Sequence, residues 1–304
     1  MLTNYFFISF KIIMRINSGN NCKVTPTFSA WNRTVYRPTK ARPLIKEVAY
    51  RNDTSFFRGD LMWDKFIKFL TDKYQDVSKV NVYNYACSNG SEPFSIIMKL
   101  LSTLGEKESE KFFPIIAKDI DTDAIKIAKS NSLPIDWYEK TSINYHTNNK
   151  FDLYFTKDPL ANSVNEEQFY YQTSNNYIQN TSGNSNDFED NQTFYFPAKS
   201  LTERVEFSKR DIFEDYKNIN PENSVVLVRN FWPYLEHNIP KLISKLAEQM
   251  GKNSTLVIGG FDVNACENFY GINLIRELIK KGFISTDEPF VFEKRSQLGS
   301  KHWY

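Results

Sequence analysis

Cysteine is scarce in this chain of 304 residues, and the three that it contains never approach the C-x-x-C spacing. Cys22, Cys87 and Cys266 are odd in number and far apart, so we expect no disulfide framework and favour a reducing compartment, the cytoplasm. The three histidines also stand apart, and His, Cys, Asp and Glu form no cluster at a metal-ligand spacing. The sequence therefore predicts no metal site.

Acidic residues are absent from the first 46 positions, which hold eight lysines and arginines. The rest of the chain has 30 basic and 36 acidic residues, a formal charge of −6, so a basic arm (1–46) precedes an acidic domain (47–304). Such an arm is either a solvated extension or a docking segment for an acidic partner, and the sequence favours neither.

The N-terminal apolar stretch, MLTNYFFISFKIIMRI, is too short to span a bilayer and is interrupted by Lys11 and Arg15. It has no charged n-region, and no small-residue cleavage site follows it. We expect no membrane insertion, and interpret the stretch as an aromatic-rich strand or as residues upstream of a true start at Met14. The chain as a whole is 41% hydrophobic, enough for a substantial core.

Strand and helix patterns alternate through the domain, which predicts a doubly wound α/β fold with a mostly parallel sheet. A polar stretch at 141–200 breaks the alternation, and we expect an insert or small subdomain with short strands and a disordered tip near 174–190. Strands are expected at 80–86, 112–120, 224–230, 254–260 and 289–295, and helices from 53 or 54 to 70, from 93 to 104, and at 121–130, 238–250 and 271–281.

The segment NYACSNGSEPFSI, residues 84–96, has the pattern of a strand end, a tight loop and a helix start. Such loops commonly hold a phosphate on the N–H groups of the helix N-terminus. This loop contains the anion Glu92 and a single glycine, Gly90, where phosphate-binding signatures need two or three. We therefore expect a ligand that is positively charged.

Other strand ends add polar groups at the same edge of the sheet, where ligands of doubly wound folds bind. Asp119 lies at the end of the second strand, where an acid commonly accepts both hydroxyls of a ribose, and Arg229 and Asn230 lie at the end of a later one. S-adenosylmethionine has a ribose, an aromatic base and a cationic tail, and it fits this set. A single glycine between small residues can be an ordinary turn, and a single acid after a strand can be a helix cap. The prediction therefore rests on the occurrence of all these residues in this order along the chain.

Four segments resemble the chemotaxis-receptor glutamate O-methyltransferases: NDTSFFR (52–58), ACSNGSEPFS (86–95), AKDIDTDA (117–124) and VRNFWPY (228–234). The resemblance runs in order from about Asn52 to Lys294. It implies a seven-stranded methyltransferase sheet with an antiparallel terminal hairpin, and S-adenosylmethionine as the donor. It also implies cofactor contacts, in addition to Gly90, from Asn52, Thr54, Arg58, Glu92, Asp119, Asp211, Ile212, Arg229 and Asn230.

The chain departs from that family mainly on the acceptor side. Asn89 and Ser91 flank Gly90 where Thr and Glu are more usual, and Pro233 stiffens the third motif. The family's helical N-terminal domain, which helps to recognise the receptor, has no counterpart of proper length in residues 1–46. The insert at 141–200 is also longer and more polar than the family implies.

A carboxylate acceptor suits a site without a general base, because a glutamate side chain with a pKa of about 4.3 is already ionised at neutral pH. His146, His237 and His302 all lie outside the motifs. Arg58 is the candidate for orienting the acceptor carboxylate, and Tyr234 either lines the path of the methyl group or packs in the core.

We therefore expect a monomeric protein-glutamate O-methyltransferase acting on a protein, such as the cytoplasmic helices of a membrane chemoreceptor. One alternative is methylation of RNA or another acceptor held by the basic arm, and the acidic domain argues against nucleic acid. Another is a non-catalytic signalling module that binds S-adenosylmethionine, against which the joint presence of Arg58, Glu92, Asp119 and Asn230 argues.

Overall fold

The structure, a computed structural model, describes residues 35–36, 50–51, 54–130, 132–159 and 193–294. Most of the expected basic arm, the expected tip at 174–190 and the expected cofactor residue Asn52 lie outside these ranges. None of the described helices is both long enough and apolar enough to cross a membrane.

A seven-stranded sheet forms the centre of the fold, in the order β11-β12-β10-β9-β3-β4-β8. Every neighbouring pair from β8 to β10 is parallel, whereas β12 is antiparallel to both β10 and β11. The predicted doubly wound sheet with an antiparallel terminal hairpin is therefore confirmed. The strands are β3 (Asn81–Tyr85), β4 (Ile115–Asp119), β8 (Val205–Lys209), β9 (Ser224–Val228), β10 (Thr255–Ile258), β11 (Phe283–Ser285) and β12 (Val291–Lys294).

The order of the strands reverses at β3, which lies between β4 and β9. From β3 the chain runs outward through β4 to β8 and then returns to β9 on the other side. The last residue of β3, Tyr85, pairs with Lys118 and with Val228, so the carboxyl ends of all three strands lie at one edge. A ligand site of this fold class is expected at that reversal.

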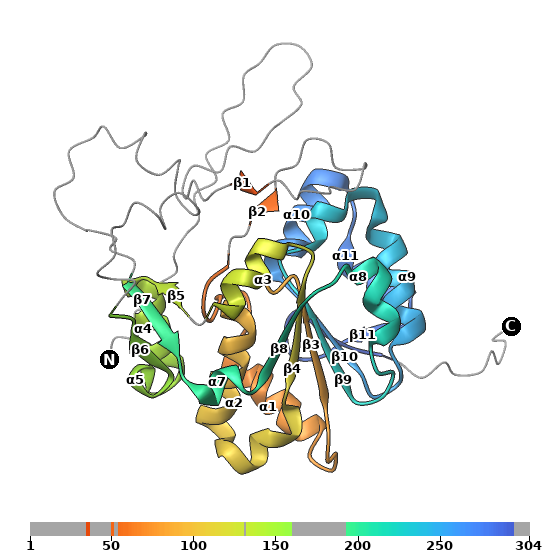
Figure 1. The fold of residues 1–304 in the computed structure, drawn as a ribbon. Helices are drawn as coiled ribbons and strands as arrows, with labels where there is room; N and C mark the ends of the chain where they lie inside the picture. The colour runs from red at the N-terminus through yellow and green to blue at the C-terminus, as the bar shows by residue number, and fades with distance from the viewer. Residues whose placement is uncertain (1–34, 37–49, 52–53, 131, 160–192, 295–304) are drawn as a thin grey trace, which may run out of the picture.

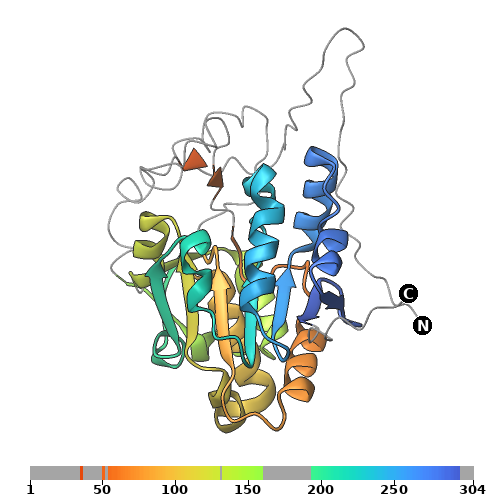
Figure 2. The same ribbon diagram turned by 90° about the vertical axis from the view of Figure 1, so that its right-hand side faces the viewer.

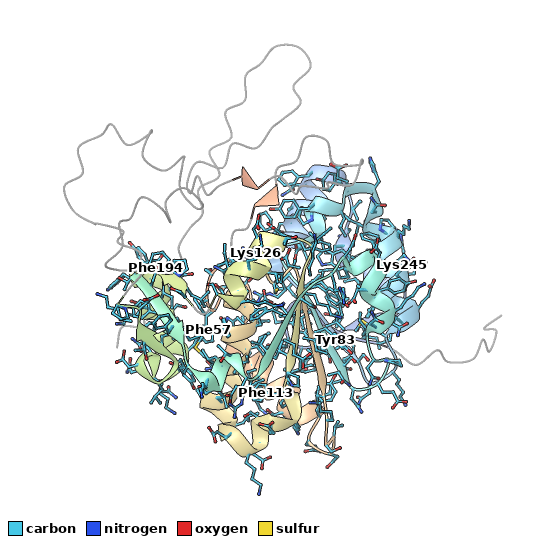
Figure 3. All side chains as sticks on the ribbon, viewed as in Figure 1. Phe57, Tyr83, Phe113, Lys126, Phe194 and Lys245 are labelled. Carbon is cyan, nitrogen blue, oxygen red and sulfur yellow. The ribbon has the colours of Figure 1, made fainter. Side chains whose placement is uncertain are left out.

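Helices cover both faces of the sheet, as Figure 1 and Figure 2 show. Residues of the first two helices pack in one core with Val82 and Ala117, and residues of the last helices pack in a second core with Tyr83. Phe57 and Tyr83 belong to these two different cores (Figure 3). The larger helices are α1 (Trp63–Lys73), α2 (Ser91–Ser109), α3 (Thr122–Lys129), α9 (Ile239–Gln249), α10 (Gly260–Tyr270) and α11 (Leu274–Lys280).

A small three-stranded antiparallel sheet lies beside the central one, in the order β5-β7-β6 (Figure 1). Its strands are β5 (Leu133–Ile135), β6 (Phe155–Lys157) and β7 (Thr193–Pro197), so it includes residues before the expected insert at 141–200. The remaining elements are β1 (Val35–Tyr36), β2 (Tyr50–Arg51), α4 (Trp137–His146), α5 (Phe151–Tyr154), α7 (Lys199–Thr202), α8 (Ile212–Asp215) and the short 3-10 helices η1 (Glu110–Phe112), η2 (Tyr216–Asn218) and η3 (Trp232–Asn238).

Candidate functional site

The loop between β3 and α2 turns sharply at the reversal point. Gly90 adopts a φ of 93°, and a Cβ atom there would lie 2.8 Å from Cζ of Phe207. A side chain at this position would therefore meet both a strained backbone and a ring. The turn places Glu92 in the first helical turn of α2, where it is buried, 7% exposed.

Glu92 shares a buried cation with a second carboxylate. The guanidinium of Arg229 is fully buried, with Nη1 3.2 Å from Oε1 of Glu92 and Nη2 paired with Oδ1 of Asp60. Burial opposes the charge on Arg229, but the two carboxylates outweigh it and raise the pKa of the guanidinium. Two carboxylates around one guanidinium leave this group with a net charge of −1, which favours a cationic ligand.

Asp119 joins the ends of three strands. Its carboxylate accepts hydrogen bonds from the backbone N–H groups of Ser88 and Asp121, both at 2.8 Å, and its carbonyl accepts one from Arg210 at 2.8 Å. Burial raises the pKa of Asp119 to about 6, in opposition to the backbone hydrogen bonds, which lower it. Each carboxylate oxygen keeps a lone pair that could accept a ribose hydroxyl.

Asp262, which sequence reasoning missed, fixes the loop after β9. Its carboxylate accepts hydrogen bonds from the N–H groups of Gly259, Asn230, Phe231 and Trp232, at 2.7 to 3.2 Å. The side chain is fully buried, and burial raises its pKa to about 7. The local signal was an acid three residues after Gly259, the pattern of a helix start.

The other expected site residues lie around this centre. Thr54 is buried and Arg58 is half-buried, and the carbonyl of Arg58 accepts a hydrogen bond from Nε1 of Trp63 at 3.1 Å. The Trp63 ring in turn lies 5.7 Å from the guanidinium carbon of Arg229. Tyr234 is half-buried in η3. Trp63 therefore links the backbone at Arg58 to the guanidinium of Arg229, which also pairs with Glu92.

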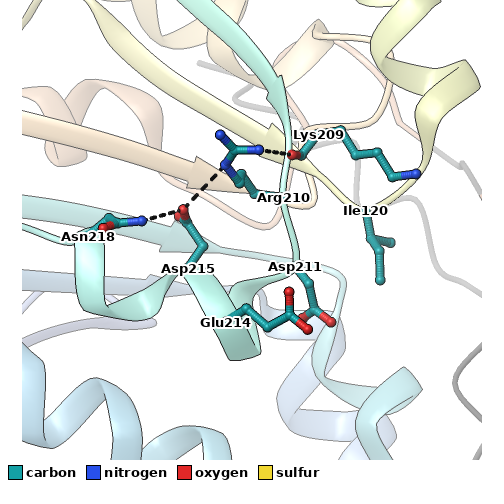
Figure 4. Close-up of a pocket in the computed structure, with 7 residues that line it drawn as sticks. All are labelled: Ile120, Lys209, Arg210, Asp211, Glu214, Asp215 and Asn218. Carbon is teal, nitrogen blue, oxygen red and sulfur yellow. Dashed lines mark hydrogen bonds and ion pairs between the residues drawn. The ribbon is translucent and has the colours of Figure 1, made fainter.

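Asp211 and Ile212 lie at the end of β8 and differ in their surroundings. Asp211 begins α8 and accepts the N–H of Phe213 at 2.8 Å, whereas Ile212 is 4% exposed and packs in the second core. Asp211 lines a cavity of about 430 Å³ (Figure 4). The other residues that line it are Ile120, Lys209, Arg210, Glu214, Asp215 and Asn218.

That cavity is lined mostly by charged and polar side chains, and it includes neither Glu92 nor Arg229. Figure 4 shows Asp215 between Arg210 and Asn218, where its carboxylate already has partners. The cavity is therefore separate from the Glu92–Arg229 group, although the expected cofactor residue Asp211 lines it.

The residues at the edge fit S-adenosylmethionine. The Ser88 hydroxyl and Nδ2 of Asn230 are buried and find no hydrogen-bond partner among the residues that the structure describes. Buried polar atoms without partners are costly, and a polar ligand would satisfy them. Together with the net negative charge at Glu92 and the carboxylate of Asp119, they match a ligand with hydroxyls and a cationic tail. The part of the chain that the structure describes holds no group of three metal-ligating side chains.

Comparisons with known proteins agree with a methyltransferase. Residues 52–168 match the family model for the CheR methyltransferase, SAM binding domain. No curated protein matches the sequence.

Similar solved structures include three methyltransferases. One is magnesium protoporphyrin IX methyltransferase (ChlM) from Synechocystis PCC 6803 with bound SAM, at 12% identity and a TM-score of 0.34, covering 77% of this chain and 78% of that one. The methyltransferase domain of bacterial CtHen1 is 8% identical, with a TM-score of 0.33, covering 77% and 98%. The rRNA methyltransferase aviRa from Streptomyces viridochromogenes is 10% identical, with a TM-score of 0.29, covering 72% and 79%.

Proposed function

We propose, from the match of residues 52–168 to the family model for the CheR methyltransferase, SAM binding domain, that this protein methylates glutamate side-chain carboxylates of a protein substrate. The family supports S-adenosylmethionine as the donor and methyl transfer as the reaction. The acceptor is our proposal. The observation that carries it is the lack of an effective base among the described histidines.

His146 and His237 are the histidines that the structure describes. The His146 ring stacks on Phe57 at 4.5 Å, and burial, with the nearby Lys99, lowers its pKa to about 4. A base with so low a pKa removes a proton poorly at neutral pH, and His237 is exposed on η3. A carboxylate acceptor needs no deprotonation, because it is already ionised.

We propose a role for each side chain, from the order of the motifs and the buried contacts at this edge of the sheet. Asp119 accepts the ribose hydroxyls, and Glu92, held against Arg229, binds the ammonium group. Arg58 orients the acceptor carboxylate, and Tyr234 lines the path of the methyl group. Bound S-adenosylmethionine supplies a methyl group on a sulfonium, and an acceptor oxygen forms the new C–O bond as the C–S bond breaks, with no proton transferred.

The proposed partner is a chemoreceptor-like protein whose cytoplasmic helices present glutamates, and the proposed enzyme acts as a cytoplasmic monomer. The acidic domain, with a formal charge of −6 beyond residue 46, opposes RNA as the acceptor. The joint presence of Arg58, Glu92, Asp119 and Asn230 argues against a site that only senses S-adenosylmethionine.

The test uses the base lability of the product. The full chain is incubated with methyl-labelled S-adenosylmethionine and a panel of bacterial membrane and soluble proteins, and the protein fraction is then made strongly alkaline. A methyl ester releases volatile labelled methanol, whereas methylated amines and base nitrogens keep the label. Volatile label supports a carboxylate acceptor.

Three other outcomes would contradict the proposal. Label that stays on protein after alkali indicates a nitrogen acceptor, and label on added RNA indicates the nucleic-acid alternative. Cofactor binding by calorimetry without label in any fraction indicates a module that binds S-adenosylmethionine without using it.

A further inference from the structure

We propose that Ser95 and Trp63 are positioning residues, which hold the backbone on either side of Arg58 and so keep this residue in the cofactor site. Ser95 lies on α2 and Trp63 begins α1, so two helices act on one short segment. The inference rests on the contact between Arg58 and the cofactor in the proposed function, and it is independent of which acceptor is methylated.

The backbone just before Arg58 has an unusual conformation. Phe57 adopts a φ of 50°, in the left-handed region that residues with a bulky side chain seldom enter. Such a conformation is strained, and it persists where the surrounding contacts enforce it, most often at functional sites. Phe57 is buried, so these contacts come from the interior of the protein.

Two buried side chains form hydrogen bonds with the backbone of this turn. The N–H of Phe57 donates to Oγ of Ser95 at 2.9 Å, and Nε1 of Trp63 donates to the carbonyl of Arg58 at 3.1 Å. Both side chains are buried, which limits competition from water. The two bonds together restrain the backbone torsions of Phe57 and Arg58.

The ring of Phe57 is held as well as its backbone. It stacks on His146 of α4, with 4.5 Å between the ring centroids, and meets Trp63 edge-on at 5.1 Å. The Trp63 ring also lies 5.7 Å from the guanidinium carbon of Arg229, which pairs with Glu92. The same indole therefore contacts both the turn before Arg58 and the buried ion group, and it fixes the position of one relative to the other.

A second explanation for Ser95 is local to its helix. Its hydroxyl also donates to the carbonyl of Ser91 at 2.7 Å, and Glu92 lies three residues before Ser95 in α2. In that case Ser95 would act on the cofactor through Glu92. The two explanations differ once Arg58 has been replaced, because an effect through Arg58 then disappears and an effect through Glu92 remains.

The experiment measures the dissociation constant of S-adenosylhomocysteine by calorimetry on the full chain and on Ser95→Ala, Trp63→Phe and Arg58→Ala. Trp63→Phe removes the indole N–H and keeps a ring beside Phe57. We expect the affinity to fall about tenfold in Arg58→Ala, the scale of one charge-assisted contact, and about three- to tenfold in each of the other two. When either change is combined with Arg58→Ala, the affinity should fall no further.

The matched control is Ser109→Ala in the same helix. Ser109 is also a fully buried serine, and its hydroxyl donates to the carbonyl of Gly105, four residues earlier, as Ser95 donates to that of Ser91. Ser109 ends α2, at the opposite end from Glu92. Ser109→Ala should lower the resistance to urea and leave the dissociation constant unchanged. Circular dichroism shows which variants are folded, and Ser95→Ala and Trp63→Phe test the turn from opposite sides.

Several results would overturn the proposal. One is a loss of affinity in Ser95→Ala or Trp63→Phe that persists in the Arg58→Ala background, and another is unchanged affinity in either variant when folded. An equal loss in Ser109→Ala would show a general effect of α2. Unchanged affinity in Arg58→Ala would mean that the turn positions no cofactor contact. The acceptor is tested separately, by the release of labelled methanol.

Discussion

Asp119 and Asp262 are buried carboxyl groups at the same edge of the sheet, and their hydrogen bonds assign them different tasks. Asp262 accepts four backbone N–H groups and is committed to holding the loop after β9. Asp119 accepts two and keeps lone pairs for a ligand. Burial raises the pKa of Asp262 to about 7 and that of Asp119 to about 6, so both carboxylates gain protons under mildly acidic conditions.

The raised pKa of Asp119 predicts a pH dependence of cofactor binding. In the proposed role the carboxylate accepts ribose hydroxyls, and its protonated form would accept them poorly. As the pH falls through about 6, S-adenosylhomocysteine should therefore bind more weakly, by about tenfold at pH 5 relative to pH 7.5. Calorimetry over this range measures the effect, and Asp119→Asn should bind weakly with a flatter profile. An unchanged profile in that variant would show that another group titrates.

Sequence reasoning found Glu92, Asp119 and Arg229 because each follows a strand end within a short motif. Asp60 and Asp262 were missed for a physical reason: their partners are distant along the chain. Asp60 pairs with Arg229 across 169 positions, and Asp262 reaches Asn230 across 32. Only the folded sheet brings these pairs together. The cofactor roles of the predicted residues remain predictions, including that of Asn52.

Individual elements at the edge are joined by a buried ion pair. Lys118 on β4 lies 2.5 Å from Asp215 at the end of α8, and Asp215 also accepts hydrogen bonds from Tyr85 on β3 and from Asn218 in η2. Burial favours the neutral form of Asp215, but these partners outweigh it and lower its pKa. The pair thus attaches α8, which begins directly after Asp211, to β3 and β4 of the sheet.

Replacing Lys118 by Met should destabilise the protein, because it removes the buried cation of the Asp215 carboxylate and leaves only the exposed Arg210, 3.8 Å away. Breaking one side of a buried pair costs about 3–5 kcal/mol in the free energy of unfolding. Urea denaturation measures the loss, and Lys118→Met/Asp215→Asn should recover much of it. The control Lys126→Met breaks an exposed pair with Asp123 and should have little effect. A similar loss in both single variants would show that burial of the pair is unimportant.

The helix α10 and the strand β8 were not expected from the sequence, although β3, β4 and β9 were. The residues of α10, GFDVNACENFY, follow a glycine pair and lack a clear apolar stripe. The helix forms because Asp262 accepts the N–H of Gly259 at its start and Gly271, at a φ of 65°, ends it. The Asp262 carboxylate holds the loop after β9 and also caps the start of this helix. The periodicity of apolar residues does not predict a helix that begins in this way.

For the whole molecule, the small sheet and the cofactor edge are separate parts of the structure. β6 and β7 pair antiparallel, with Lys157 opposite Tyr195, and the Asp158 N–H donates to the carbonyl of Phe194 at 2.8 Å. The chain therefore leaves and re-enters the small sheet at adjacent points. None of the expected cofactor residues lies on its strands.

Replacing residues 160–192 by a short Gly/Ser linker should leave the dissociation constant of S-adenosylmethionine within about twofold of the wild-type value. The reason is that the strand ends that supply Glu92, Asp119 and Arg229 stay as they are, while β6 and β7 are close enough for a short connection. Calorimetry with the full-length chain as the reference checks this. A large loss of affinity would show that 160–192 contributes to the cofactor site.

The class and topology of the fold could be predicted because alternating strands and helices allow few arrangements. The position of each strand in the sheet could not be worked out from apolar pattern alone, since β9 (SVVLV) and β10 (TLVI) are both apolar and fully buried. The antiparallel end of the sheet came from the family resemblance. The small sheet depends on pairing between Leu133 and Tyr195, which no local pattern encodes.

The place of β3 in the sheet also has a consequence for synthesis. β3 pairs with β9 from Asn81↔Ser224 to Tyr85↔Val228, so one side of the central strand stays open until the chain has been made as far as residue 228. A nascent polypeptide that ends at residue 168 contains Glu92 and Asp119 but exposes the backbone of a buried strand. Arg229 is the residue that follows. The strand that pairs with β3 and the cation that pairs with Glu92 and Asp60 are therefore made one after the other, late in translation.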